Sequence, residues 1–292
     1  MKVVDQENLK YILDQTVNLA DNSGFHNSII RGKSLGTAIT AEQYAQISAG
    51  TFHNMFLGDY WTIGENDWVI VHFDYYYVPS RAHHIVLMPR NPMSIPNNTA
   101  LIGNGGYLTF VNEETDLLKS WNQEVQTTGG YPWSRMRRQV LRAADTIIST
   151  LFGNHAYAQV MLMPNPPQTS YLTDAEYRWE WFNLSDQNEV LRRGFCELPN
   201  MTQIMGHAGM VTDPTANYFH MITIEAQGNN WRQFALFSNG GGQDILKDSF
   251  WLSTPVNAWN VFNMLSTTDG IVINYTTQNS ELAIKPRIVI QG

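Results

Sequence analysis

Residues 58–75 read Gly58-Asp59-Tyr60-Trp61-Thr62-Ile63-Gly64-Glu65-Asn66-Asp67-Trp68-Val69-Ile70-Val71-His72-Phe73-Asp74-Tyr75 and contain the clearest structural pattern of the chain. Two runs rich in aromatic and β-branched residues flank a short polar segment around Gly64. Within each run the side chains alternate between two sets, a period that is typical of β-strands. A short polar segment with a glycine is typical of the tight turn that joins two antiparallel strands. The pattern therefore predicts a β-hairpin.

Helix signals lie on both sides of this hairpin. Thr40-Ala41-Glu42-Gln43 fits a capping box and predicts a helix over residues 41–48. An apolar stripe at helical spacing predicts a longer helix over residues 135–152, which ends at Gly153. A further helix is expected around residues 198–205.

The rest of the chain is dominated by strand signals, with a proline-rich loop over residues 91–98. Apolar or alternating runs predict strands at residues 85–88, 218–225, 232–237, 249–252, 271–275 and 282–290. The mixture predicts an α+β fold that is rich in strands and has two or three helices.

A short amphipathic helix is expected ahead of this domain. Residues 7–20 carry an apolar stripe at helical spacing, and Asn22-Ser23-Gly24 supplies a stop. The stripe includes Leu9, Ile12, Leu13 and Val17. The helix either docks on its own domain or forms a contact with other subunits, and the sequence leaves both open. We divide the chain into residues 1–29, a helical attachment or oligomerisation segment, and residues 30–292, one domain.

Composition limits the partners. The 292 residues include 18 basic and 26 acidic side chains, which give a net charge of −8. Nucleic-acid binding depends on concentrated Lys and Arg, so we expect no nucleic-acid partner. Only 15% of residues are charged and 12% are aromatic. That balance favours aromatic packing and large contacts between subunits.

Cys196 is the only cysteine. An intramolecular disulfide and a thiolate-rich metal site are therefore excluded. No run of about 20 apolar residues is present, and the first residues lack the apolar core of a signal peptide. We expect synthesis and folding in the cytosol, with no membrane insertion.

Several motifs together resemble a family of prophage and phage virion structural proteins. They are the run from Ile30-Arg31-Gly32 to Gly58-Asp59-Tyr60-Trp61, the pair His83-His84 with the following Ile85-Val86-Leu87-Met88-Pro89, Ser134-Arg135-Met136-Arg137, Phe152-Gly153-Asn154-His155 and Leu282-Ala283-Ile284-Lys285-Pro286-Arg287. The resemblance covers roughly residues 30–292. Residues 156–195 match poorly and are either an insertion or a diverged stretch.

The resemblance implies a C-type-lectin-like mixed domain, related in shape to formylglycine-generating enzymes. Its final strand would close back near the N-terminal strand of the module. Phe250-Trp251-Leu252-Ser253-Thr254 fits a family position at which Ser253 replaces an arginine. Any role of that charge is therefore not carried over to this chain.

The same resemblance implies a virion protein exposed on the particle, as a head fibre, a decoration protein or a tail appendage. Its partners would be other virion proteins and further copies of itself, with a trimer favoured, and it would be made in the cytoplasm of the bacterial host. The alternative is an adhesin that recognises host cell-wall glycans. Its sugar-stacking surface would include Trp179, Trp181, Trp251 and Trp259, although core packing is the simpler interpretation of any one of them.

Catalytic and metal-binding patterns are weak. A formylglycine-type oxidase needs two thiols, and Cys196 stands alone. Glu197-Leu198-Pro199-Asn200 only imitates the calcium-binding triplet of sugar-binding lectins. Glu176 and Glu180 could face a sugar as two carboxylates, but a solvated edge beside aromatic residues is the simpler interpretation.

The histidines offer one further metal-site hypothesis. His72, Asp74 and either His83 or His84 could converge across strands on a zinc ion, but a buried histidine beside a surface one is the simpler interpretation. The glycine runs 103–106 and 240–242 are expected to be turns rather than phosphate-binding loops. We therefore expect a protein that is not an enzyme and that uses neither a cofactor nor a metal.

Overall fold

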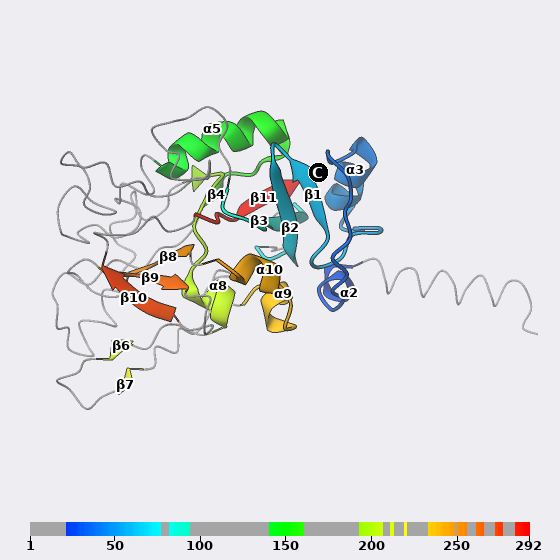
Figure 1. The fold of residues 1–292 in the computed structure, drawn as a ribbon. Coiled ribbons are helices and arrows are strands. Elements are labelled where there is room, and N and C mark those ends of the chain that lie inside the picture. The colour runs from blue at the N-terminus through cyan, green and yellow to red at the C-terminus, as the bar shows by residue number, and fades with distance from the viewer. Residues whose placement is uncertain are drawn as a thin grey trace, which may run out of the picture.

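The computed structural model describes about half of the chain, in ten internal segments and the C-terminal end (Figure 1). The described residues are 22–76, 82–93, 140–160, 193–206, 211–212, 219–220, 233–248, 250–255, 261–265, 272–276 and 284–292. All structural statements below refer to these residues.

The predicted hairpin is confirmed. Strands β1 (Tyr60–Ile63) and β2 (Asn66–Phe73) are antiparallel, with Tyr60 opposite Val69 and Ile63 opposite Asn66. Gly64 and Glu65 join them with φ angles of 57° and 65°. Two successive left-handed residues are the signature of a two-residue type I′ turn, whose twist matches that of the strands.

The hairpin forms half of a four-stranded antiparallel sheet in the order β1-β2-β3-β11. Strand β3 (His84–Pro89) confirms the strand predicted at residues 85–88, and β11 (Ile288–Gln291) is shorter than the predicted 282–290. The expected closure of the last strand near the N-terminal strand is wrong. Strand β11 pairs with β3 and lies at the opposite edge from β1, because β2 bonds one side of β1 and residues 33–36 bond the other.

Helices surround this sheet (Figure 1). In Figure 1, α5 lies on one side of the sheet, α9 and α10 on the other, and α2 and α3 at one end. The bounds are α2 (Ser23–His26), α3 (Ala41–Ala49), α5 (Leu141–Phe152) with the following 3-10 turn η2 (Gly153–His155), α8 (Met201–Met205), α9 (Ala235–Ser238) and α10 (Gln243–Leu246).

Local capping explains where two helices begin. The capping box of α3 is confirmed, since the Thr40 hydroxyl accepts from the Gln43 amide while the Gln43 side chain accepts from the Thr40 amide. Helix α8 starts later than the predicted residue 198. Its amide groups are capped by Asn200, whose side chain accepts from the Gln203 amide while the Gln203 side chain accepts from the Asn200 amide.

Helix α5 confirms residues 141–152 of the predicted helix, and residues 135–139 lie outside the described part. Its apolar stripe is buried, and Gly153 follows with a φ of 56°. Trp68 of β2 contacts Phe152 of α5 edge to face, at 5.8 Å between ring centroids.

The strand predicted at residues 232–237 is wrong, because residues 235–238 form α9. The backbone carbonyl of Phe234 accepts from the amides of Phe237 and Ser238, which closes a helical turn. The Ala235 amide donates to the His72 ring, 163 residues earlier in the chain. Tertiary contacts and the glycine turn at 240–242 therefore override the strand pattern.

A second sheet has the order β10-β9-β8. Strands β8 (Phe250–Pro255) and β10 (Val272–Thr276) confirm the strands predicted at 249–252 and 271–275, whereas β9 (Val261–Leu265) was not predicted. Two further pairs are short. Strand β6 (Val211–Thr212) pairs with β7 (Phe219–His220), the described part of the predicted strand 218–225.

The two ends of the poorly matching segment 156–195 lie together. Strand β4 (Gln159–Val160) pairs with β5 (Arg193–Gly194), with Val160 opposite Arg193. The residues that flank 161–192 are therefore hydrogen-bonded neighbours. The residues between these strands lie outside the described part.

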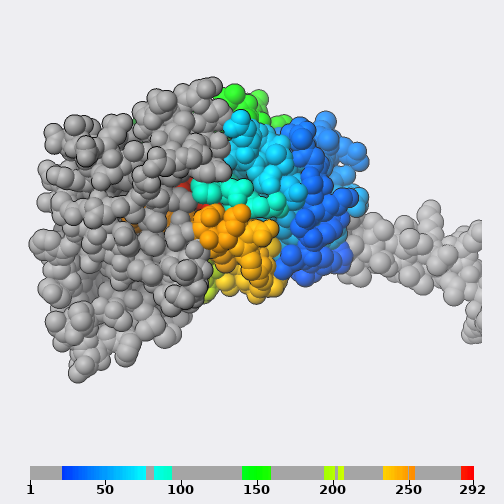
Figure 2. All heavy atoms as spheres, viewed as in Figure 1, coloured from blue at the N-terminus to red at the C-terminus, as the bar shows by residue number. Residues whose placement is uncertain are grey.

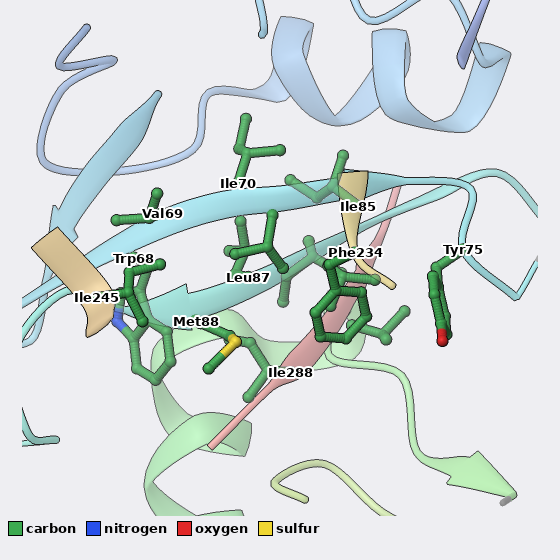
Figure 3. Packing of buried hydrophobic residues seen from close by; sticks show 14 of the residues in the cluster. Trp68, Val69, Ile70, Tyr75, Ile85, Leu87, Met88, Phe234, Ile245 and Ile288 are labelled. Atoms are coloured by element: carbon green, nitrogen blue, oxygen red, sulfur yellow. The ribbon is translucent and has the colours of Figure 1, made fainter. Parts of the chain in front are cut away.

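One hydrophobic core unites segments that are far apart in the sequence. Figure 3 shows Ile70 of β2, Leu87 of β3, Ile288 of β11, Ile245 of α10 and Phe234 packed together. Residues 22–29 join the same body, because the buried His26 donates to the Met55 carbonyl at 2.6 Å and the Asn27 side chain bonds the backbone of Phe73. The described part is thus an α+β fold.

The hairpin turn provides a test of this packing. A Cβ on Gly64 would lie 2.8 Å from the methyl groups of Leu151, and its φ of +57° is unfavourable for other residues. Gly240 has a φ of +76° with open space around it. Gly240→Ala should lower the unfolding free energy by about 1–2 kcal/mol through the backbone alone. Gly64→Ala should cost more in urea unfolding, and equal costs would contradict the packing of Leu151 on the turn.

Candidate functional site

Of the four tryptophans proposed for sugar stacking, only Trp251 lies in the described part, and it does not fit that role. Trp251 is 0% exposed and belongs to the hydrophobic core, so it is not part of an aromatic surface. Burial in β8 next to Phe250 and Leu252 explains this. The other candidates lie outside the described residues: Trp179, Trp181 and Trp259, the carboxylates Glu176 and Glu180, and the attachment residues Leu9, Ile12, Leu13 and Val17.

The histidines considered for zinc bind protein groups instead. Asp74 accepts from the His83 ring at 2.7 Å and from the His84 amide at 2.9 Å. His84 Nε2 accepts from the Tyr76 amide, which leaves the ring proton on Nδ1, 3.1 Å from the Ala82 carbonyl. These bonds fix the two ends of the segment that begins at Asp74 and ends at His84.

His72 lies opposite Val86, two residues before Asp74 in the chain, and its ring accepts from the Ala235 amide at 2.8 Å. The structure therefore joins Asp74, His83 and His84 by hydrogen bonds, whereas the His72 ring binds the first residue of α9. Among the described residues, no group of three or more His, Cys, Asp or Glu is arranged to hold a metal ion. The residues that imitate a calcium triplet in the sequence have other positions in the fold. Glu197 is buried, and Asn200 caps α8.

A buried carboxylate organises the N-terminal end of the described fold. Asp59 is 0% exposed, and its two oxygens accept from Nε and Nη2 of Arg31, the shortest at 2.6 Å. They also accept from the backbone amides of Lys33 and Phe56, at 2.8 and 2.9 Å. One side chain thereby joins the segment at 31–33 to the loop at 50–58 and to the start of β1.

The loop at 50–58 is held in an unusual backbone conformation. Phe52 and Asn54 have φ angles of 50° and 56°, in the left-handed region that side chains other than glycine rarely adopt. Such residues persist only where the surroundings fix them. Here Arg31 donates to the Asn54 carbonyl at 2.7 Å, Asp59 binds the Phe56 amide, and His26 donates to the Met55 carbonyl.

This rigid loop presents apolar rings near the N-terminus. Phe56 contacts Phe25 at 6.2 Å between ring centroids, and the Arg31 guanidinium lies 4.6 Å over the Phe56 ring. Phe25 and Ile30 are 37% and 43% exposed, and they are two of the three exposed large apolar residues in the described part. We call Phe25, Ile30 and Phe56 the α2 surface.

A second buried charge ties the C-terminal strand to the rest of the domain. The Lys285 ammonium is 0% exposed and donates to the carbonyls of Arg90 and Ile245, at 2.8 and 2.6 Å, and to Asp248 at 2.8 Å. Burial lowers the pKa of Lys285 to about 8, against the opposing effect of Asp248. Lys285 thus links the end of β3, α10 and the approach to β11.

Sequence reasoning missed the Asp59 and Lys285 clusters and the α2 surface. Arg31 and Asp59 belong to the family-like motifs at 30–32 and 58–61, and their opposite charges are the only sign in the sequence that they pair.

None of the helices within the described ranges is long and apolar enough to cross a membrane. Chemically, the polar side chains above hold backbone groups in place.

Comparison with family models, with curated proteins and with solved structures finds no match to this chain.

The Asp59 cluster predicts a large loss of stability on substitution. Asp59→Ala would leave the Lys33 and Phe56 amides without their acceptor and Arg31 without its counter-charge. We expect the unfolding free energy to fall by about 3–5 kcal/mol in urea titration. The matched control is Asp67→Ala, because Asp67 pairs with Arg90 while 23% exposed and should cost about 1 kcal/mol or less. Similar losses for both variants would contradict the central role of Asp59.

Lys285 predicts a specific pH dependence. Its pKa is about 8 in the folded chain and near the ordinary 10.5 in the unfolded chain, so the unfolded chain binds more protons between these values. The unfolding free energy of the wild type should therefore rise with pH across this window, by at most about 3 kcal/mol relative to Lys285→Met. Urea titrations of both proteins from about pH 7.5 to 10.5 measure the difference. A difference that stays flat would show that burial does not disfavour the charged lysine.

Proposed function

We propose that this protein is a structural protein of a bacteriophage particle, exposed on the virion as a head fibre, decoration protein or tail appendage, and that it is not an enzyme. The proposed outer part is a C-type-lectin-like domain. The motifs Ile30-Arg31-Gly32 and Gly58-Asp59-Tyr60 resemble this family. The described α+β fold is compatible with such a domain.

The observation that carries the proposal is that two residues of the family-like motifs, Arg31 and Asp59, fix the backbone of a neighbouring loop. Arg31 and Asp59 hold the loop at 50–58 in its left-handed conformation, and that loop presents Phe56 beside Phe25. A rigid loop that displays aromatic rings next to an arginine suits a protein contact, since these residue types are enriched in interfaces.

The adhesin alternative draws little support from the described residues. Trp251 is buried, and the other tryptophans proposed for sugar stacking lie outside the described part. We therefore rank a role in the architecture of the particle above direct recognition of host glycans. A glycan-binding role would then depend on residues within the segment 161–192 or near Trp259.

Purified particles test this proposal. Phage particles induced from the strain that encodes the protein should contain this chain in whole-number proportion to the other virion proteins, as measured by quantitative mass spectrometry with labelled peptides. Its absence from purified particles, with the chain present in the lysate, would contradict a structural role.

The same sample separates the two functions. The isolated chain should pass unretained over a column of cell-wall polysaccharide from the host and should bind particles that lack it. Retention on the polysaccharide without binding to particles would favour the adhesin.

A further inference from the structure

We propose that His72 is an acid-sensitive latch. At neutral pH its ring holds helix α9 on the four-stranded sheet, and protonation of the ring in mild acid releases α9 and exposes its apolar side chains. This inference goes beyond the proposed function and does not rest on it.

The bond between His72 and α9 exists only while the ring is neutral. The Ala235 amide donates to Nδ1 of His72 at 2.8 Å. A neutral imidazole has one nitrogen that accepts a hydrogen bond, whereas both nitrogens of the protonated ring carry a hydrogen and donate. Protonation would therefore place the N–H of the ring against the N–H of Ala235 and replace an attraction by a repulsion.

Three other histidines keep their bonds when they are protonated. In His26, His83 and His155 the bonded ring nitrogen faces an oxygen, either of a backbone carbonyl or of the Asp74 carboxylate, and therefore donates. A second proton on these rings leaves that bond in place. The direction of the bond therefore distinguishes His72, and burial alone does not, since His26 is also buried.

The surroundings of His72 do not favour a charged ring. The residue is 5% exposed and lies opposite Val86 in the sheet. The Tyr75 ring meets the His72 ring edge to face at 4.9 Å between centroids, and the Phe234 ring lies at 6.2 Å. Figure 3 shows the Tyr75 and Phe234 rings side by side. Removing a charged ring from water into such surroundings costs free energy, so the closed state disfavours the proton.

Among the described residues, the titratable groups next to His72 along β2 or at the start of β3 are Tyr75, Asp74 and His84. Tyr75 is a neutral phenol at neutral and acid pH. The Asp74 carboxylate accepts from the His84 amide and lies 3.9 Å from the His84 ring, so its charge acts on that ring. His84 in turn accepts from the Tyr76 amide. Protonation of His84 would free Tyr76, whereas protonation of His72 frees α9.

The segment that His72 holds is also bound at both of its ends. The Phe234 amide donates to the Gln203 carbonyl of α8 at 2.8 Å. The Asn239 side chain donates to the Asn27 carbonyl, just after α2, at 2.8 Å. The His72 bond lies between these two contacts in the sequence and is the one whose acceptor is lost when a histidine takes up a proton.

Release of α9 would expose apolar surface. The helix contains no charged residue, and Leu236 and Phe237 are 1% and 7% exposed. Figure 2 shows the segment 233–248, in orange, at the molecular surface beside the blue N-terminal part. A segment at the surface can open locally while the sheet beneath it stays paired.

Proton linkage gives the direction and the size of the effect. An exposed histidine takes up a proton near about pH 6.5, whereas the closed latch requires a neutral ring. The open state therefore binds more protons below this pH, and the closed state loses stability as the pH falls. The fraction of open molecules should rise about tenfold for each pH unit below 6.5, and about a hundredfold between pH 7.5 and 4.5.

Hydrogen–deuterium exchange of the full chain from about pH 7.5 to 4.5, corrected for the intrinsic rates of the amides, measures this opening. The amides of Phe237, Ser238 and Asn239 report it, because each donates within the α9 turn. We expect their opening to rise about a hundredfold while the amides of β3 change less. No rise in α9, or equal rises in α9 and β3, would overturn the proposal.

Two matched variants test the role of the ring. His72→Asn places a side-chain oxygen near the position of Nδ1, and this oxygen accepts from the Ala235 amide at every pH. We expect α9 to stay closed in this variant and its acid-induced opening to disappear. His155→Asn removes a histidine that donates, and it should leave the response of α9 unchanged. A His72→Asn chain that opens in acid like the wild type would overturn the proposal. If His72→Asn does not fold, the comparison of α9 with β3 in the wild type still decides.

Discussion

The buried carboxylate of Asp59 is the interaction on which the N-terminal half of the described fold depends. It is inaccessible to solvent, it neutralises Arg31, and it accepts from two backbone amides in different segments. A buried charge is costly unless it is paired and hydrogen-bonded, and here both conditions are met within one cluster. The left-handed residues of the loop at 50–58 and the position of Phe56 follow from this arrangement.

Two other polar clusters also hold separate segments of the chain together. Lys285 joins the end of β3 and α10 to the segment before β11, and Asp74 fixes His83 and His84 at the start of β3. Each cluster includes bonds to backbone groups. The sheet between them is apolar, so these polar contacts determine where the loops and the last strand attach, while the hydrophobic core supplies most of the driving force for folding.

Local patterns predicted the elements that depend on local physics. The alternation at 60–73, the capping box at Thr40 and the apolar stripe of α5 were all recognisable, because each signal lies within a few residues. The α+β class followed from them. Helix α9 was missed because its first amide is bound by His72, far away in the sequence.

Contacts between distant residues explain the other misses. The pairing of β11 with β3 and the bond from Lys285 to the Arg90 carbonyl join residues about two hundred positions apart, and a single sequence carries no sign of such pairs. Trp251 is of a residue type that can stack on sugars, but whether it is exposed depends on the surrounding core, which buries it. The α2 surface escaped notice because exposure of Phe25 and Ile30 is a property of the folded chain.

Together these features describe a domain whose loops and last strand are fixed by buried polar clusters. Hydrogen–deuterium exchange of the wild type and of Asp59→Ala tests the role of Asp59 most directly, because it shows which segments lose protection. We expect Asp59→Ala to exchange faster than the wild type in residues 31–33 and in the loop at 50–58. Exchange in that loop that is unchanged by the substitution would contradict the central role of Asp59.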